Sequence, residues 1–274
     1  MTTARPLNPS VETPDGPRRS TTGPLVAVLV VAVCLTIGLS FAWLVLRAVG
    51  ADPDSPAGTG WGNVLGFAPA AALLGLWVVR REQRPFSALG LRGPGRVRRL
   101  LLGVGTAIVG LIVLNIVAGA VASGSEQEGG GALALPQALL LLVTFAVQAP
   151  TEELLFRGFL LPVLCRRWGM AAGVLLTSAL FGLAHLINPA APPVYALLTF
   201  LLGLALAMWT LADGNLWRAC AFHTVWNWAP TAFGGGGDGN ASGLDAATVT
   251  SVACVLALLA ACALWSLRRS LRRG

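Results

Sequence analysis

Long apolar segments separated by short polar stretches dominate this chain of 274 residues. Eight of these segments approach or exceed the roughly 20 residues that an α-helix needs to cross a bilayer. The pattern therefore predicts an all-α, polytopic membrane helix bundle with about eight transmembrane helices. The expected segments are 25–46, 61–79, 100–121, 133–164, 170–187, 194–212, 216–233 and 246–267.

The composition supports this interpretation and argues against a soluble protein. Hydrophobic residues make up 55% of the chain, charged residues make up 11%, and the mean hydropathy is +0.72. A soluble domain would carry about a quarter charged residues. The five cysteines are scattered, mostly in apolar segments, and form no Cys-x-x-Cys pair. We interpret them as small apolar packing residues rather than as disulfide or metal ligands.

The basic residues predict the orientation of the bundle. All 19 are arginines, and with both termini inside, every arginine except Arg47 and Arg157 lies on the cytoplasmic side. The positive-inside rule therefore predicts cytoplasmic N- and C-termini. The net charge of +7 follows from this topology and does not imply nucleic acid as a partner. Abundant Ala, Gly and Pro with no lysine is typical of a GC-rich bacterium, so we expect a multi-pass protein of the plasma membrane.

The ends of the chain differ from its apolar body. Residues 1–23 are rich in Pro, Thr and Arg, which predicts a disordered cytoplasmic tail, and residues 268–274 form a basic cytoplasmic tail. Between them, residues 24–267 are expected to form one transmembrane domain. Within that domain, the segment 80–99 carries seven arginines around a short apolar stretch. It is interpreted either as an interfacial piece at the head groups or as a solvated loop.

Three charged residues interrupt the longest apolar segment, 133–164. Ionisable groups are costly in such a segment, so Glu152, Glu153 and Arg157 are functional candidates by default. Glu153 and Arg157 are four residues apart, so on a helix they share a face and can pair. Glu152 points about 100° away, which leaves its carboxylate for acid–base chemistry. The alternative is a purely architectural ion pair. The residues able to kink this long segment are Pro150, Gly158 and Pro162.

Both histidines of the chain lie in later apolar segments. His185 follows Phe181 by one helical turn, and His223 shares a helix face with Asn227. Alone, each is more often a packing or helix-linking residue than a catalytic one. Depth can be counted at about 1.5 Å per residue from the inner membrane boundary, which the arginines mark. On this count Glu152 lies about 18 Å deep, and His185, His223 and Asn227 lie about 10–22 Å deep. These side chains can therefore meet inside the bundle.

Three motifs follow one another on three apolar segments: Glu-Glu-x-x-x-Arg at 152–157, Phe-x-x-x-His at 181–185 and His-x-x-x-Asn at 223–227. In this order and spacing they resemble the CPBP family of intramembrane proteases. This family is also called the Abi family and includes relatives of the type II CAAX prenyl endopeptidase. The resemblance covers roughly residues 80–233, with its core at about 133–233. Leu89-Gly90-Leu91 resembles a further family feature.

The resemblance implies an eight-helix bundle that acts as an endopeptidase on a membrane-embedded or membrane-anchored protein or peptide. By analogy with the family, Glu152 and His185 together activate a water molecule as a general base. A carboxylate–imidazole pair is chemically able to take a proton from water. Prenylated tails are the substrates of eukaryotic relatives, whereas a bacterium without protein prenylation would need other targets.

The resemblance implies supporting roles in the reaction for the remaining motif residues. Arg157 holds Glu153 as a structural or electrostatic partner. His223 and Asn227 stabilise the oxyanion and position the substrate, a task for which an amide donor is suited.

A catalytic metal is the main chemical alternative. Glu152, His185 and His223 together are a possible zinc set, because two histidines and a glutamate hold zinc in known hydrolases. The chain has no His-Glu-x-x-His motif, and the glutamates are partly engaged by Arg157. A metal-free glutamate mechanism is therefore favoured over a zinc mechanism.

Two other functional classes remain open. A catalytically silent member of the same family would act as an immunity or scaffold protein in a membrane complex. An ion-coupled transporter would use the same buried acids and histidines, but it should also show repeated pairs of broken helices, which the sequence does not show. The intact motif set favours a peptidase over both.

Overall fold

The computed structural model describes residues 22–53, 55–121, 132–187, 191–233 and 246–272. Within these ranges the chain is helical and contains no strand, which confirms the all-α prediction. Proline stands at the first turn of several helices, where its missing N–H costs nothing. The α-helices are α1 (Pro24–Ala48), α2 (Pro56–Arg80), α3 (Arg96–Val121), α4 (Leu135–Glu153), α5 (Leu161–Ala184), α6 (Pro193–Asp213), α7 (Trp217–Phe233) and α8 (Ala246–Leu271).

Six helical stretches among the described residues are long and apolar enough to cross a membrane. Together with the exposed leucines, isoleucines and valines on their outer faces, they identify a multi-pass membrane protein. One stretch, Leu135–Ile187, is 53 residues long and contains both α4 and α5. Gly169 interrupts it with φ 83° and ψ 166°. Gly173 then returns close to the backbone of Cys165, so the chain reverses direction there.

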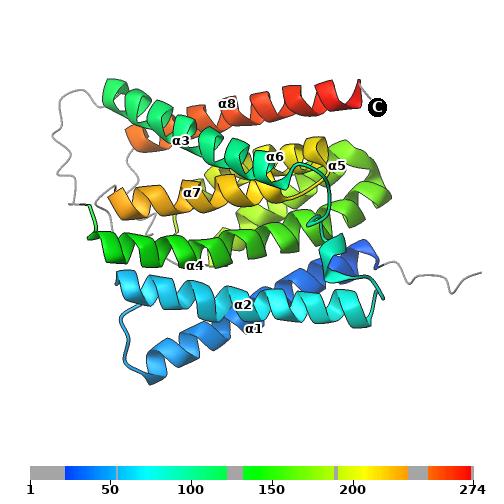
Figure 1. Cartoon of the computed structure of the whole chain (residues 1–274), viewed down its shortest axis with the longest axis horizontal. Helices are drawn as coiled ribbons and strands as arrows, with labels where there is room; N and C mark the ends of the chain where they lie inside the picture. The colour runs from blue at the N-terminus through cyan, green and yellow to red at the C-terminus, as the bar shows by residue number, and fades with distance from the viewer. Residues whose placement is uncertain (1–21, 54, 122–131, 188–190, 234–245, 273–274) are drawn as a thin grey trace, which may run out of the picture.

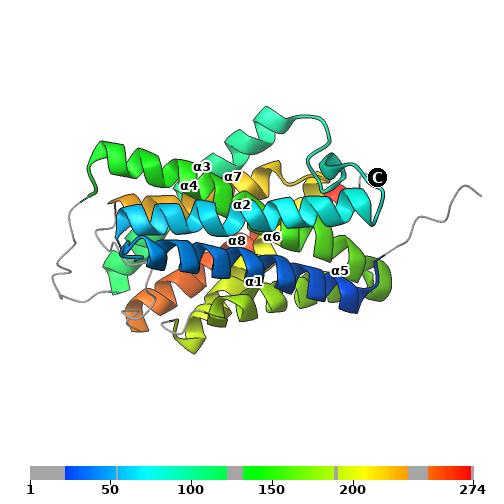
Figure 2. The same cartoon turned by 90° about the horizontal axis from the view of Figure 1, so that it is seen from below.

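The helices lie roughly parallel in the bundle (Figure 1). α2 packs on α4, α4 on α7, α7 on α3, and α3 on α8, while α5 packs on α6 and α6 on α8. Figure 2 shows α1 and α2 in front of the bundle, and α1 contacts α2 and α5. α4, α5 and α7 carry the three sequence motifs, so this packing brings the motifs to the interior.

The predicted tails lie largely beyond what the structure describes. Residues 1–21 of the expected N-terminal tail fall outside the described ranges. At the other end, α8 continues through Arg268 and Arg269 to Leu271, so the start of the expected basic tail is helical.

The arginine-rich segment 80–99 is anchored in the bundle by its apolar residues. A short 3-10 helix, η1 (Phe86–Ala88), leads into Leu89, whose side chain is 0% exposed. The N–H of Leu216, just before α7, donates to the carbonyl of Gly90 at 2.9 Å. Arg99 and Arg218 both pair with Asp213. These contacts tie the segment to the ends of α6 and α7, so it is not a plain solvated loop.

The buried Leu89 backbone makes Gly158 a sensitive position. A Cβ added at Gly158 would lie 2.5 Å from the carbonyl oxygen of Leu89 and 3.3 Å from the Leu216 side chain. We expect Gly158→Ala to cost about 1–3 kcal/mol of stability, because a buried backbone carbonyl cannot move aside cheaply. Thermal unfolding in detergent measures this. Gly105→Ala is the matched control, because a Cβ there meets nothing within 4 Å. Equal melting temperatures for the two variants would contradict the expectation.

Candidate active site

Glu152 and Glu153 end α4, and Arg157 lies in the segment that follows. That segment, Leu154–Leu160, is a π-helix, and the N–H of Leu161 at its end donates to the carbonyl of Phe156, five residues back. Single π turns within α-helices occur frequently at functional sites. All three charged side chains are buried, with 6% of Glu152, 0% of Glu153 and 1% of Arg157 exposed.

The predicted ion pair between Glu153 and Arg157 is present. Arg157 Nη1 donates to Glu153 Oε1 at 2.9 Å. The same carboxylate oxygen accepts from His223 Nδ1, also at 2.9 Å. One glutamate oxygen therefore links α7 to the π-helix through two buried hydrogen bonds.

The remaining contacts of Arg157 help to offset the burial of its charge. Nη2 donates to the carbonyl of Gly203 on α6 at 3.3 Å. The guanidinium carbon lies 4.2 Å from the ring centroid of Phe181, which is a close cation–π arrangement. Arg157 thus connects α5 and α6 to Glu153.

Glu152 is less engaged than Glu153. Its Oε1 accepts a hydrogen bond from Gln148 Nε2 at 3.1 Å. Its Oε2 lies 3.5 Å from His223 Nε2, and no group in the described part of the chain forms a hydrogen bond with this buried oxygen. The prediction that Glu152 is turned away from Arg157 agrees with this geometry, and one oxygen is left available for chemistry.

His223 stands between the two glutamates. Because the Glu153 carboxylate accepts the hydrogen bond at Nδ1, that nitrogen carries a proton, and Nε2 is directed toward Glu152. Asn227, one turn further along α7, donates from Nδ2 to Gln148 Oε1 at 3.3 Å. Gln148 therefore joins Asn227 to Glu152.

His185 also packs against the Phe181 ring. Its Nδ1 donates to the carbonyl of Phe181 at 2.8 Å, and its ring packs edge-on to Phe181 and to Tyr195. Phe181 also contacts the His223 ring, with centroids 5.8 Å apart. Among the described residues, no hydrogen bond or ion pair joins His185 to Glu152.

The structure thus brings the six predicted residues into one region, in two groups. Glu152, Glu153, Arg157 and His223 are in direct contact; Asn227 joins them through Gln148, and His185 through Phe181. Sequence reasoning did not select Gln148 or Tyr195. The signal for Gln148 was its place four residues before Glu152, on the same helix face. Tyr195 is the single tyrosine of the chain, and it lies close enough to Glu152 for an electrostatic interaction.

The three possible zinc ligands, Glu152, His185 and His223, do not all face one another. Among the described residues, no group of three or more His, Cys, Asp or Glu side chains is arranged to hold one. Glu152 and His223 face each other, but His185 is turned toward the Phe181 carbonyl. The zinc set suggested by composition is therefore not assembled in this arrangement.

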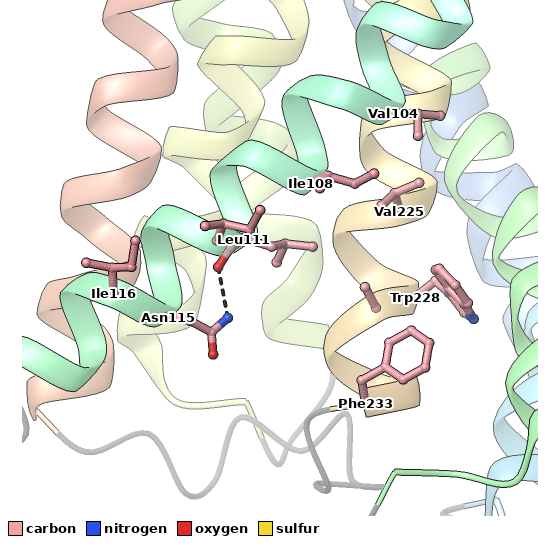
Figure 3. Close-up of a pocket in the computed structure, with 10 residues that line it drawn as sticks. Val104, Ile108, Leu111, Asn115, Ile116, Val225, Trp228 and Phe233 are labelled. Carbon is pink, nitrogen blue, oxygen red and sulfur yellow. Dashed lines mark hydrogen bonds between the residues drawn. The ribbon is translucent and has the colours of Figure 1, made fainter.

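An apolar groove of about 590 Å³ opens between α3 and α7 (Figure 3), and none of the six predicted site residues lines it. Val104, Ile108 and Ile112 of α3 face Val225 and Trp228 of α7. The amide of Asn115 in this groove donates to the Leu111 carbonyl of its own helix at 2.8 Å. The groove accordingly offers an apolar surface rather than reactive groups.

Comparison with known families supports the assignment of the motifs. Residues 134–229 match the family model described as type II CAAX prenyl endopeptidase, Rce1-like. Over these residues the chain is similar to this family of CAAX-type proteases. The match includes all six predicted site residues and ends two residues after Asn227. No curated protein and no solved structure matches the chain.

The similarity to the Rce1-like family covers the region that holds the buried cluster. The family is one of endopeptidases, and the matched region contains α4, the π-helix and α5 to α7 up to Ala229. Within this region, the side chains of Glu152, Glu153, Arg157 and His223 are buried inside the bundle of helices.

Proposed function

We propose that this protein is an intramembrane endopeptidase that hydrolyses a peptide bond of a membrane-associated protein or peptide. The observation that carries the proposal is the state of Glu152. Its Oε2 is buried, has no hydrogen-bond partner among the described residues, and lies 3.5 Å from Nε2 of His223. A carboxylate held in this way can accept a proton from a water molecule.

In the proposed reaction, Glu152 and His185 activate the attacking water. Because a backbone carbonyl can only accept, His185 donates from Nδ1 and keeps a lone pair at Nε2 when neutral. The water oxygen bonds to the carbonyl carbon as its proton passes to Glu152. The proton is then delivered to the leaving nitrogen as the carbon–nitrogen bond breaks, which gives a carboxylic acid and an amine.

His223 and Asn227 are proposed to stabilise the negative charge on the carbonyl oxygen. In its imidazolium form, His223 offers an N–H at Nε2 while Nδ1 stays bound to Glu153. Asn227 has two N–H groups, of which Gln148 uses one. Preorganised donors of this kind contribute about 10²–10³ in rate.

Glu153 and Arg157 are proposed to hold the site rather than to react. Both Nη1 of Arg157 and Nδ1 of His223 are bound to Glu153 Oε1. A carboxylate engaged in this way fixes the orientation of the imidazole, as a carboxylate does in known histidine-dependent sites.

We propose a metal-free mechanism, which predicts that chelators leave the activity intact. Purified protein treated with 1,10-phenanthroline should retain its cleavage rate, because no step needs a Lewis acid in place of the two bases. Elemental analysis of the same sample provides a second readout. One zinc ion per chain, together with activity that is lost on chelation and restored by zinc, would contradict the mechanism.

The proposed topology has eight crossings and cytoplasmic termini in a bacterial plasma membrane. α4 and α5 account for two crossings within the 53-residue stretch, because the chain reverses at Gly169. The six apolar stretches therefore give seven crossings, and α7, with 17 residues, brings the number to eight. The arginines at the end of α2, just before the reversal at Gly169 and at the end of α8 then lie on the cytoplasmic side, as the positive-inside rule requires.

Peptide profiling of membranes tests the function directly. Membranes from cells with and without the protein are compared by mass spectrometry for membrane peptides whose processing depends on it. The purified protein is then expected to cleave such a peptide at the same bond. Purified protein that leaves every protein-dependent substrate uncut would overturn the proposal.

A further inference from the structure

Gln148 lies outside the three motifs, yet it contacts two of them. Its amide donates to Glu152 Oε1 at 3.1 Å and accepts from Asn227 Nδ2 at 3.3 Å. Gln148 and Glu152 are one turn apart on α4, whereas Asn227 lies on α7. The side chain is half-buried, as is Asn227, so the pair lies toward the accessible side of the buried glutamates.

The two contacts of Gln148 constrain each other. An amide has an acceptor end and a donor end, so binding Asn227 at the oxygen directs the nitrogen to Glu152. The Glu152 carboxylate can only accept, which fixes the same orientation from the other side. The amide therefore has one arrangement that satisfies both neighbours.

This arrangement orients two groups that the proposed reaction uses, the Glu152 carboxylate and the Asn227 amide. The hydrogen bond to Glu152 Oε1 holds the carboxylate rotation that leaves Oε2 free beside His223. The bond from Asn227 uses one of its two N–H groups and thereby sets the direction of the other. Loss of either bond would leave a reacting group free to rotate.

We propose that Gln148 is a positioning residue that sets the orientation of both the base Glu152 and the oxyanion donor Asn227. The inference rests on the proposed function. Gln148 touches no reacting atom and acts through its two neighbours. A simple tether between α4 and α7 would stabilise the fold without changing the rate of the chemical step.

Replacing Gln148 by methionine removes both hydrogen bonds and keeps the length of the side chain. In the full-length protein, with a cleaved membrane peptide as substrate, Gln148→Met should lower kcat about tenfold or more and change KM by less than about threefold. The loss is smaller than the 10²–10³-fold that removal of a direct oxyanion donor causes. Gln137→Met is the matched control, because Gln137 lies on the exposed face of the same helix. It should behave as wild type.

A second variant separates the two bonds. The carboxylate of Gln148→Glu can still accept from Asn227, but it offers no N–H to ionised Glu152 and adds a negative charge beside it. We expect this variant to lose at least as much kcat as Gln148→Met. The double variant Gln148→Met/Asn227→Ala should be little slower than Asn227→Ala alone, because groups that act as a unit are not additive.

The outcomes distinguish this inference from the proposed function. If Glu152→Gln abolishes cleavage while Gln148→Met retains wild-type kcat, the positioning role is wrong and the base assignment stands. A loss in Gln148→Met that follows only a lower melting temperature, with kcat per folded molecule unchanged, identifies a tether and likewise overturns the role. If Glu152→Gln cleaves as wild type, the assignment of Glu152 as the base fails, and if wild type cleaves no peptide, the proposed function itself fails.

Discussion

Glu152→Gln is expected to lower kcat by about 10³-fold or more while the protein keeps its fold. The glutamine amide has the shape of the carboxylate and can still accept from Gln148, but it cannot take a proton from water. General-base catalysis contributes about 10²–10⁴ in rate, and here the same group also carries the proton to the leaving nitrogen. Cleavage of a membrane-anchored reporter by the purified variant measures the effect, with the melting temperature as the test of folding.

A matched carboxylate outside the site provides the control for this experiment. Glu82 is 5% exposed and pairs with Arg84 at 3.0 Å on the segment that follows α2. Glu82→Gln should therefore retain kcat. His185→Ala, like Glu152→Gln, should lose activity, because the proposed reaction uses both groups.

The same variants decide between a protease and a scaffold. If cleavage survives both Glu152→Gln and His185→Ala, the catalytic assignment is wrong. If wild type cleaves no peptide and its function in cells survives both changes, the protein acts as a silent member of its family.

Arg157→Met should produce the largest loss of stability of any single substitution in the site. The change leaves the buried Glu153 carboxylate with the hydrogen bond to His223 Nδ1 but without its arginine, and removing one partner of a buried ion pair costs about 3–5 kcal/mol. The contacts to the Gly203 carbonyl and to the Phe181 ring are lost as well. Thermal or denaturant unfolding in detergent micelles measures the effect.

Two comparisons make the Arg157 result specific. Arg96→Met removes an exposed arginine at the start of α3 and should change stability by less than about 0.5 kcal/mol. Arg157→Met combined with Glu153→Gln removes the charge on both sides and should recover part of the loss, because the unpaired carboxylate is gone. A double variant that is no more stable than Arg157→Met would mean that packing, rather than charge, dominates at this position.

The predictable part of the structure follows from local rules. Segment lengths placed the helices within a few residues, as for 194–212 against Pro193–Asp213 and 216–233 against Trp217–Phe233. The Glu153–Arg157 pair follows from a spacing of four within one helix, and the structure confirms it.

The unpredictable part depends on how helices are rotated against each other. Gln137, Thr144 and Gln148 all interrupt the apolar pattern of α4, and nothing local indicates which of them meets α7. Prolines and glycine in this region predicted a kink, whereas the chain forms a π-helix that carries Arg157 toward α6. Spacing likewise could not show that Phe181 contacts both histidine rings, because that depends on how α5 and α7 pack against each other.

The length of α7 has a consequence for the lipid around the site. Its 17 residues extend about 25 Å, whereas a bilayer has a hydrocarbon core of about 30 Å. In the proposed topology, we expect the bilayer beside α7 to thin to match the shorter helix. Head groups and water then lie closer to His223 and Asn227 than they would if α7 were as long as α1 or α8. Hydrolysis needs water in a medium that excludes it, and local thinning at α7 would shorten the path that the water has to travel.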